Sequence, residues 1–266
     1  MAATGAIRED MPVLWQLRLS HYNEKVRWAL DHKRIPHVRR SLLPGLHAFV
    51  ARRLTGGTTT PVLTLGDHSI GDSTRIIAAI EERWPTPPLY PDEPSQRRRA
   101  LELEELFDEE LGPHIRRASY FELLPHPEVL VPLFAQGQPR PARALIRAGF
   151  PLLRAMMRRG LQVNADAARE SRCRTAAAMD LLENEIQPSG YLVGDSFTVA
   201  DLTAAALFYP VARPAEFPYP LTRDRPAGAR EFLDPLARRP GGRWVAEMYR
   251  RHRTPRETTV GGRAQG

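Results

Sequence analysis

Ser20 lies where a protein can bind an anion. The preceding residues, Val13 to Leu19, alternate in polarity and predict a strand, and from His21 onward apolar residues recur with helical spacing. Ser20 is therefore expected to be the N-cap, with its hydroxyl beside unpaired N–H groups at the positive end of the helix dipole. Such a position can stabilise a bound thiolate. The alternative is that Ser20 only caps the helix.

Thr60-Pro61 comes directly before an apolar run that predicts another strand, Pro61 to Leu65. Proline cannot donate a ladder hydrogen bond, so it is tolerated at a strand start, and a cis bond is a known device at such turns. A cis Thr60–Pro61 bond would turn the N–H and C=O of Thr60 outward. We expect these groups to pair with an extended, peptide-like ligand as an added strand.

Asp72-Ser73 opens a predicted helix. Backbone N–H groups at a helix start can hold a carboxylate, and the Asp72 side chain can take a nearby ammonium. With Ser20 and Thr60, this pair would hold a small peptide that has a free α-amino acid end and a thiol. The alternative for Asp72-Ser73 is simple capping.

The elements that must position these residues form an α/β pattern in the order βαβαββα over the first ninety residues. The strands are expected at Val13–Leu19, His37–Leu42, Pro61–Leu65 and His68–Gly71, and helices from His21, over Pro44–Leu54 and from Asp72. In the third helix Ile76, Ile80 and Trp84 recur at a spacing of four and predict an apolar stripe that faces a sheet.

A proline-rich linker, Pro85 to Pro94, separates this pattern from an all-helical remainder. Helices are expected at Ser95–Leu124, Arg140–Leu161, Ala165–Ile186, Thr198–Tyr209, Ala229–Ala237 and Arg243–His252. Proline-rich insertions interrupt them at 125–141 and 210–226. We expect an α/β domain over 12–88, a helical domain over 95–253 and a disordered tail over 254–266.

Composition excludes several classes of function. The 266 residues carry a formal net charge of +7, but of 38 basic residues only Lys25 and Lys33 are lysines, and the arginines are scattered in pairs and one triplet. No basic motif is interleaved with aromatic residues, so we expect no nucleic-acid partner. No apolar run is long enough to span a membrane, so we expect no membrane partner. The N-terminus lacks a secretory signal, which predicts a cytoplasmic location.

The metal and redox classes are also disfavoured. The eight histidines show no metal-ligand spacing, so no metal site is expected. The single cysteine, Cys173, excludes an internal disulfide and a CxxC site. It lies mid-helix among alanines and arginines and is expected to be a small core residue.

Taken in order, these motifs resemble the glutathione S-transferase superfamily. Residues 13–90 are similar to its thioredoxin-like N-terminal domain: Ser-His-Tyr-Asn-Glu-Lys-Val-Arg follows the first strand, Thr-Pro-Val-Leu carries the expected cis-proline, and Asp-Ser opens the third helix. The segment 190–202 resembles a folding motif of the helical domain, with Thr198 as N-cap and Asp201 reaching back to it. The resemblance covers about 13–124 and 164–253.

The resemblance implies a role for each matching residue. Ser20 would donate a hydrogen bond to the thiolate of bound glutathione and lower the thiol pKa, with Tyr22 as the alternative hydroxyl. Thr60, before Pro61, would hold the cysteinyl backbone, and Asp72 with Ser73 the γ-glutamyl end. His47 either holds the glycine carboxylate or is an ordinary surface histidine. The electrophile pocket would use an apolar lining from Tyr120, Phe121, Met156, Met157 and Phe217, unless these are ordinary core residues.

We therefore expect a glutathione S-transferase that delivers a thiolate to an apolar electrophile, and by family habit a homodimer. A serine at position 20 cannot form a mixed disulfide, so conjugation, isomerisation or elimination is favoured over thioltransfer. His21 replaces a proline common in the family and Thr60 a commoner valine. These departures leave two alternatives: a non-catalytic binding or scaffold protein, and a thiol-dependent isomerase or lyase. The thiol could also be another low-molecular-weight thiol.

Overall fold

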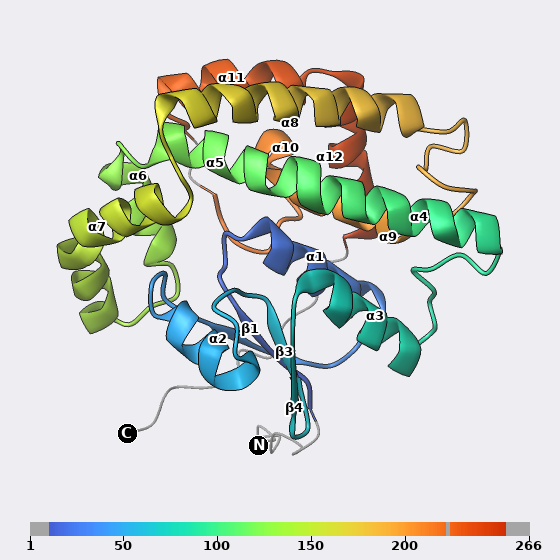
Figure 1. Ribbon diagram of the computed structural model, residues 1–266, viewed down its shortest axis with the longest axis horizontal. Coiled ribbons are helices and arrows are strands. Elements are labelled where there is room, and N and C mark those ends of the chain that lie inside the picture. The colour runs from blue at the N-terminus through green and yellow to red at the C-terminus, as the bar shows by residue number, and fades with distance from the viewer. Residues whose placement is uncertain (1–10, 222–223, 254–266) are drawn as a thin grey trace, which may run out of the picture. The chain divides into compact units, whose positions relative to one another are not determined.

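The computed structural model describes residues 11–221 and 224–253, which fall into two compact units (Figure 1). The first ends at Pro87 and holds the sheet; the second begins at Pro88 and is helical. We refer to them as the sheet unit and the helical unit. The expected tail, 254–266, lies outside the described residues.

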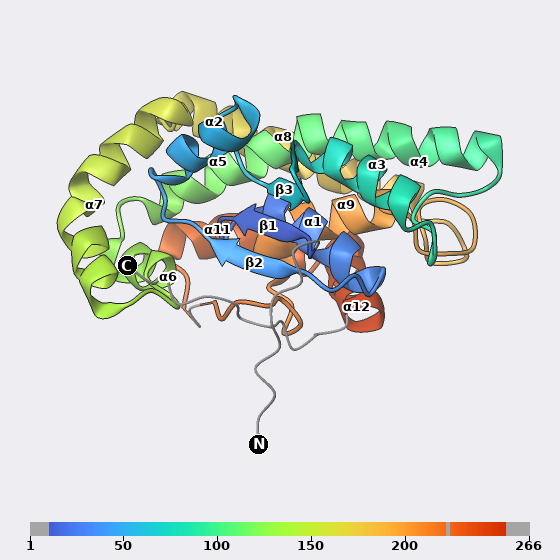
Figure 2. The ribbon, with the colours of Figure 1, turned by 90° about the horizontal axis from the view of Figure 1, so that it is seen from below.

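The sheet unit has the order βαβαββα that the sequence predicts. Its elements are β1 (Val13–Gln16), α1 (His21–His32), β2 (Val38–Ser41), α2 (His47–Thr55), β3 (Val62–Leu65), β4 (His68–Gly71) and α3 (Ser73–Arg83). The strands lie in the order β2-β1-β3-β4 (Figure 2). β1 and β2 are parallel, and the other two pairs are antiparallel. The sheet is therefore mixed, as the resemblance implies.

One apolar core joins α1 and α3 to the sheet. Leu14 and Leu63 from the strands meet Val26 and Leu30 of α1, and Ile76 and Ile80 of α3, all without exposed surface. Trp84 packs at the edge of this cluster, so the predicted stripe of α3 does face the sheet. The core fixes the starts of both helices relative to the strands, and these starts carry the predicted site residues.

The helical unit contains α4 (Pro94–Leu106), a π-helical turn η1 (Phe107–Leu111) and α5 (Gly112–Leu123), then α6 (Pro127–Phe134), α7 (Arg140–Gly160), α8 (Ala165–Glu185), α9 (Val199–Leu207), α10 (Tyr209–Ala212), α11 (Ala227–Ala237) and α12 (Pro240–His252). The long helix expected over Ser95–Leu124 is thus three elements. The first insertion is also partly helical, because Pro127 at a first helical position lacks only an N–H that would be unpaired anyway. No helix within 11–221 and 224–253 is long and apolar enough to cross a membrane.

The predicted cap of α9 is confirmed. The Thr198 hydroxyl accepts from the Ala200 N–H at 3.3 Å, and the Asp201 carboxylate accepts from the Thr198 N–H at 2.8 Å. Asp201 also accepts from the Leu192 N–H at 2.8 Å, so it ties the preceding loop to the helix. Burial raises the pKa of Asp201 to about 6, and these hydrogen bonds act in the opposite direction.

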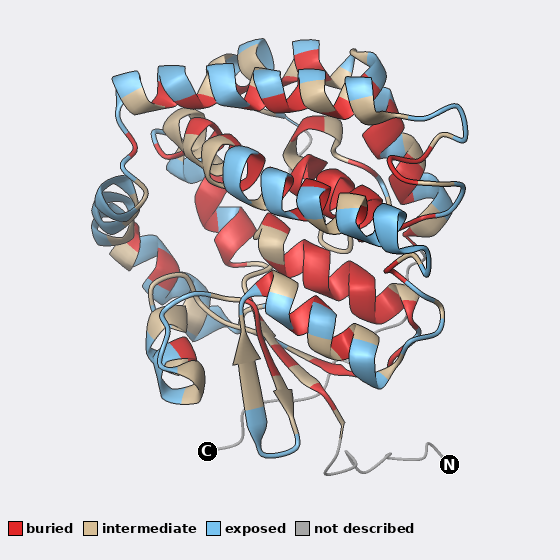
Figure 3. Cartoon of the chain, turned by 45° about the vertical axis from the view of Figure 1, so that its right-hand side comes forward, coloured by how far each residue is buried: buried red, intermediate tan, exposed pale blue. Residues whose placement is uncertain are grey.

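The expectation for Cys173 is wrong: the thiol lies on an exposed part of α8. The buried residues of this helix are Ala168, Ser171, Thr175, Ala178, Met179 and Leu182, which repeat at helical spacing and define one face. Cys173 is two residues from both Ser171 and Thr175, which places it on the opposite side. Figure 3 shows how the buried and exposed sides alternate along the helices.

Candidate functional site

Strand register brings the three predicted motifs to one end of the sheet. Trp15 of β1 is opposite Val62 of β3, and Val62 is opposite Gly71 of β4. β1 and β4 therefore end where β3 begins. Ser20 follows β1, Thr60-Pro61 precedes β3 and Asp72-Ser73 follows β4, so all three lie at that end.

Ser20 is the N-cap of α1, as predicted. Its backbone is extended (φ −79°, ψ 126°), and its Oγ accepts from the Asn23 N–H at 3.4 Å. The cap contact uses the hydroxyl oxygen as acceptor and leaves the hydroxyl hydrogen to be donated. The side chain is only partly buried, so a ligand can reach it.

Asn23 is a site residue that the sequence analysis did not single out. It is fully buried, and its Nδ2 donates to the Thr60 Oγ1 at 3.2 Å. Its Oδ1 is also buried and has no hydrogen-bond partner among the described residues. Its position was a usable signal, since Asn23, Val26 and Leu30 share one helix face at i, i+3 and i+7. A polar residue in that apolar stripe needs a polar partner, and Thr60 is that partner.

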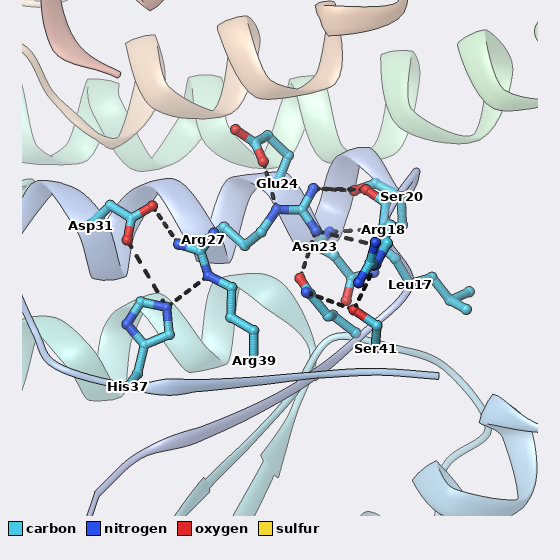
Figure 4. Close-up of polar contacts among 11 residues, drawn as sticks. Leu17, Arg18, Ser20, Asn23, Glu24, Arg27, Asp31, His37, Arg39 and Ser41 are labelled. Carbon is cyan, nitrogen blue, oxygen red and sulfur yellow. Dashed lines mark hydrogen bonds and ion pairs between the residues drawn. The ribbon is translucent and has the colours of Figure 1, made fainter. Parts of the chain in front are cut away.

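Arg27 of α1 holds the loop between β1 and α1. Its buried guanidinium forms an ion pair with Glu24 at 2.6 Å (Figure 4). The same group donates to Gln16 Oε1 at 2.7 Å and to the carbonyls of Leu17, Arg18 and Ser20 at 3.5, 3.1 and 3.4 Å. One side chain thus fixes the backbone that presents Ser20.

The Thr60–Pro61 peptide bond is cis, as predicted. Within the described part of the chain, no backbone group pairs with the N–H or the C=O of Thr60. The Thr60 side chain is held by Asn23, so the backbone around it is positioned while its own polar groups stay open to a ligand.

Asp72 caps α3, and its conformation is unusual. It has φ +72°, a region that side-chain-bearing residues rarely adopt, and Oδ1 accepts from the Arg75 N–H at 3.1 Å. Asp72 is exposed and Ser73 is buried. Asp72 therefore caps the helix, which is the alternative that the sequence analysis gave. The same turn also places a carboxylate beside the N–H groups of the helix start.

His47 and Tyr22 contact residues that are close to them in the chain. His47 begins α2, and its Nδ1 accepts from the Gly45 N–H at 3.1 Å. Burial lowers the pKa of His47, with a smaller opposing effect from the Leu43 backbone, so the ring is neutral at pH 7. The Tyr22 ring packs on His21 with their centroids 4.5 Å apart.

The five candidates for an apolar pocket differ in their exposure to solvent. Met156 is 54% exposed on α7, whereas Phe217 is buried and stacks on Tyr209 with centroids 4.2 Å apart. Tyr120, Phe121 and Met157 are partly buried. Phe217 is explained by packing within its own unit.

Comparisons with known protein families decide the classification. The family model for the glutathione S-transferase N-terminal domain matches residues 14–88, and the model for the C-terminal domain of the same family matches residues 145–240. The chain belongs to the glutathione S-transferase superfamily. No curated protein matches its sequence.

Solved structures of this superfamily share the fold. A glutathione S-transferase from Methylobacterium radiotolerans in complex with glutathione sulfonate is 22% identical, with a TM-score of 0.55 over 87% of this chain and 92% of the other. One from Methylobacillus flagellatus with bound glutathione is 18% identical, with a TM-score of 0.59 over 91% and 96%. The beta-etherase LigF from Sphingobium sp. strain SYK-6 is 17% identical, with a TM-score of 0.60 over 89% and 99%.

The glutathione-bound structures of this superfamily can be set beside the three motifs at the end of the sheet. Two of these neighbours were solved with glutathione or a glutathione derivative. In this chain the helix cap, the open backbone beside the cis-proline and the second helix start are all present at one sheet end. The residues present fit a small acidic peptide with a thiol.

Proposed function

We propose that this protein is a glutathione transferase, which binds glutathione at this end of the sheet and stabilises its thiolate through Ser20 for attack on an apolar electrophile. The observation that carries the proposal is the link from Ser20 through Asn23 to Thr60. It connects the hydroxyl to the unpaired backbone of Thr60, where an extended peptide could pair.

Thr60 would orient the peptide. Its N–H and C=O would pair with the cysteinyl residue as a short added strand. Asp72 would bind the γ-glutamyl ammonium through Oδ2, since Oδ1 accepts from Arg75. The N–H groups at the start of α3, with Ser73, would hold the γ-glutamyl carboxylate. His47 is neutral and so offers a hydrogen bond, rather than a full charge, to the glycine carboxylate.

Ser20 would donate its hydroxyl hydrogen to the sulfur. Because the same oxygen accepts from the Asn23 N–H, the hydroxyl is polarised and becomes a better donor. The start of α1 adds a partial positive charge. Both favour the charged form of the thiol and lower its pKa from about 8.5, and each unit of pKa is about 1.4 kcal/mol. Serine is too weak an acid to act as the nucleophile itself.

Substitution of Ser20 tests this role. In Ser20→Ala we expect the pKa of bound glutathione to rise by about one unit, because one donor to the thiolate is lost. The measurement is the ultraviolet absorbance of the thiolate as a function of pH, at saturating glutathione. Ser69→Ala removes a hydroxyl elsewhere in the same sheet unit and should leave the pKa unchanged. An identical pKa in the wild type and Ser20→Ala would refute the role of Ser20.

A second candidate is an ether-cleaving enzyme, which the likeness to the beta-etherase LigF favours. The thiolate would displace the alcohol from an ether substrate, so that a C–S bond replaces the C–O bond and the alcohol leaves with the thiol proton. Mass spectrometry of the products identifies this reaction by the released alcohol beside the thioether, whereas a thiol-dependent isomerase or lyase would return the thiol unconsumed. A third candidate, a binding protein without turnover, predicts glutathione binding by calorimetry and no product from any electrophile. Calorimetry against other low-molecular-weight thiols identifies the thiol.

A further inference from the structure

α7 concentrates positive charge to a degree that the linear sequence does not show. It carries six arginines, all exposed: Arg140, Arg143, Arg147, Arg154, Arg158 and Arg159. No aspartate or glutamate occurs between Glu128 and Asp166. The arginines that look scattered along the sequence thus include six exposed ones on a single helix, with no acidic residue nearby in the chain.

The same helix exposes an apolar stripe. Leu145, Leu152 and Met156 are 61%, 68% and 54% exposed, and their spacing of seven and four residues puts them on one face. Only Ile146 and Phe150 of α7 are buried, and the helix packs mainly against α6 (Figure 1). Large apolar side chains exposed along one face mark a site of interaction.

α8 shows that this pattern is not general in the helical unit. α8 is also 21 residues long, yet its arginines pair with carboxylates: Arg169 with Asp166 at 3.2 Å, Arg174 with Glu110 at 3.1 Å, and Arg172 with Glu122. The arginines of α7 form no ion pair with any residue in 11–221 or 224–253. The only polar contact of these arginine side chains in that part of the chain is the bond from Arg143 Nε to the Gln138 carbonyl.

We propose that α7 docks on the surface of an anionic lipid bilayer. The apolar stripe would enter the boundary between headgroups and acyl chains, and the arginines would contact anionic headgroups. An interfacial helix needs no long apolar run, so the composition argument against membrane spans does not apply to it. The charges favour this occupant over the alternatives. A second copy of α7 would bring six more arginines and no carboxylate, and a nucleic acid would leave the leucines unused.

Vesicle co-sedimentation tests the proposal. We expect the full-length protein to sediment with vesicles of equal parts phosphatidylglycerol and phosphatidylcholine and to stay in solution with phosphatidylcholine alone. Leu145→Ser/Leu152→Ser and Arg154→Gln/Arg158→Gln should each weaken binding at least tenfold. These side chains are exposed, so circular dichroism should be unchanged. Arg169→Gln/Arg174→Gln on α8 removes the same charge and should bind as the wild type does.

Several outcomes would overturn the proposal. It fails if the protein ignores anionic vesicles, or if the α8 control loses as much binding as the α7 arginine variant, because net charge alone would then explain the effect. It also fails if Leu145→Ser/Leu152→Ser abolishes a dimer seen by analytical ultracentrifugation without vesicles, because the stripe would then be covered by a second copy. The proposal is also refuted if the protein does not bind vesicles but binds duplex DNA, and Leu145→Ser/Leu152→Ser still binds the DNA. The pKa of bound glutathione is measured separately and does not depend on the result.

Discussion

At the scale of residues, Asn23 joins the two groups that the proposed chemistry requires. Its backbone N–H donates to the Ser20 Oγ, and its side-chain amide donates to the Thr60 Oγ1. Asn23 thus links the start of α1 to the loop before the cis-proline. Its buried Oδ1 has no hydrogen-bond partner among the described residues.

We predict that Asn23→Ala raises the KM for glutathione about fivefold, because the loss of one hydrogen bond that positions Thr60 costs about 1 kcal/mol. Thr60→Val should have a similar effect, since it removes the other end of the same bond. The double variant should be no worse than either single variant. Steady-state kinetics of the three variants check this, and fully additive effects would show that Asn23 and Thr60 act separately.

The sequence predicted several of these positions but not the contacts between them. Ser20, Pro61 and Asp72 were found from local rules for capping and for proline, which act within a few residues. Asn23 was missed because its partner is 37 positions away along the chain. Arg27 was missed for a related reason. Its partners are backbone carbonyls, and any residue type can supply these.

At the scale of elements, the turn between β1 and α1 depends on one buried ion pair. Arg27 and Glu24 are both fully buried, and the guanidinium also donates to three loop carbonyls. A buried pair is costly to break from one side, because the remaining charge loses its closest counter-charge in a region of low dielectric.

We predict that Arg27→Met lowers the free energy of unfolding by about 3–5 kcal/mol, because Glu24 loses this ion pair while still buried. Glu24→Leu/Arg27→Met should recover more than half of that loss, since neither charge is then buried. Urea denaturation followed by circular dichroism provides the measurement. If the double variant is less stable than Arg27→Met, the ion pair is not the cause. Thiol binding should stay impaired in both variants, because Ser20 has lost its backbone support.

Element prediction succeeded where periodicity was strong and failed where backbone geometry intervened. α7 and α8 were predicted to within one residue at each end, and the predicted start of α3 at Asp72 is one residue before its first helical residue. The helix expected over Ser95–Leu124 is broken by the π-turn at Phe107–Leu111, which residue spacing alone does not reveal. α6 was missed because prolines were taken only as helix breakers, although Pro127 occupies a first helical position.

At the scale of the whole molecule, composition does not show how the charged residues are distributed over the surface. The net charge of +7 is the same whether the arginines are scattered or gathered, and the structure adds that the six on α7 are all exposed. The expected homodimer and the cytoplasmic location stay predictions. Within the helical unit, however, titratable groups with little or partial exposure make the free energy of unfolding depend on pH in a way that the sequence does not show.

His252, the last residue of α12, is the clearest of these groups. Its ring stacks on Phe197 with centroids 4.3 Å apart, and its Nε2 lies 3.2 Å from the Tyr191 hydroxyl. That hydroxyl accepts from Arg251 at 2.6 Å and can donate its own hydrogen to Nε2 of a neutral His252. Burial, with a smaller effect from Arg251, lowers the pKa of His252 to about 4.

The pKa is lower in the folded state than in the unfolded state, so between about pH 6.5 and 4 the unfolded chain binds a proton that the folded chain does not. Stability is therefore lost as the pH falls through this window. We predict that His252→Phe, which keeps the ring stack but cannot titrate, loses less stability than the wild type as the pH falls from 7 to 5. The difference in the free energy of unfolding should grow by about 1 kcal/mol over this range, a value that allows for solvent screening of a partly exposed ring. Urea denaturation at pH 8, 7, 6 and 5 measures it. The difference between the two proteins should be constant from pH 8 to 7, where the ring is mostly neutral in both states, and a difference that stays constant down to pH 5 would contradict the assignment.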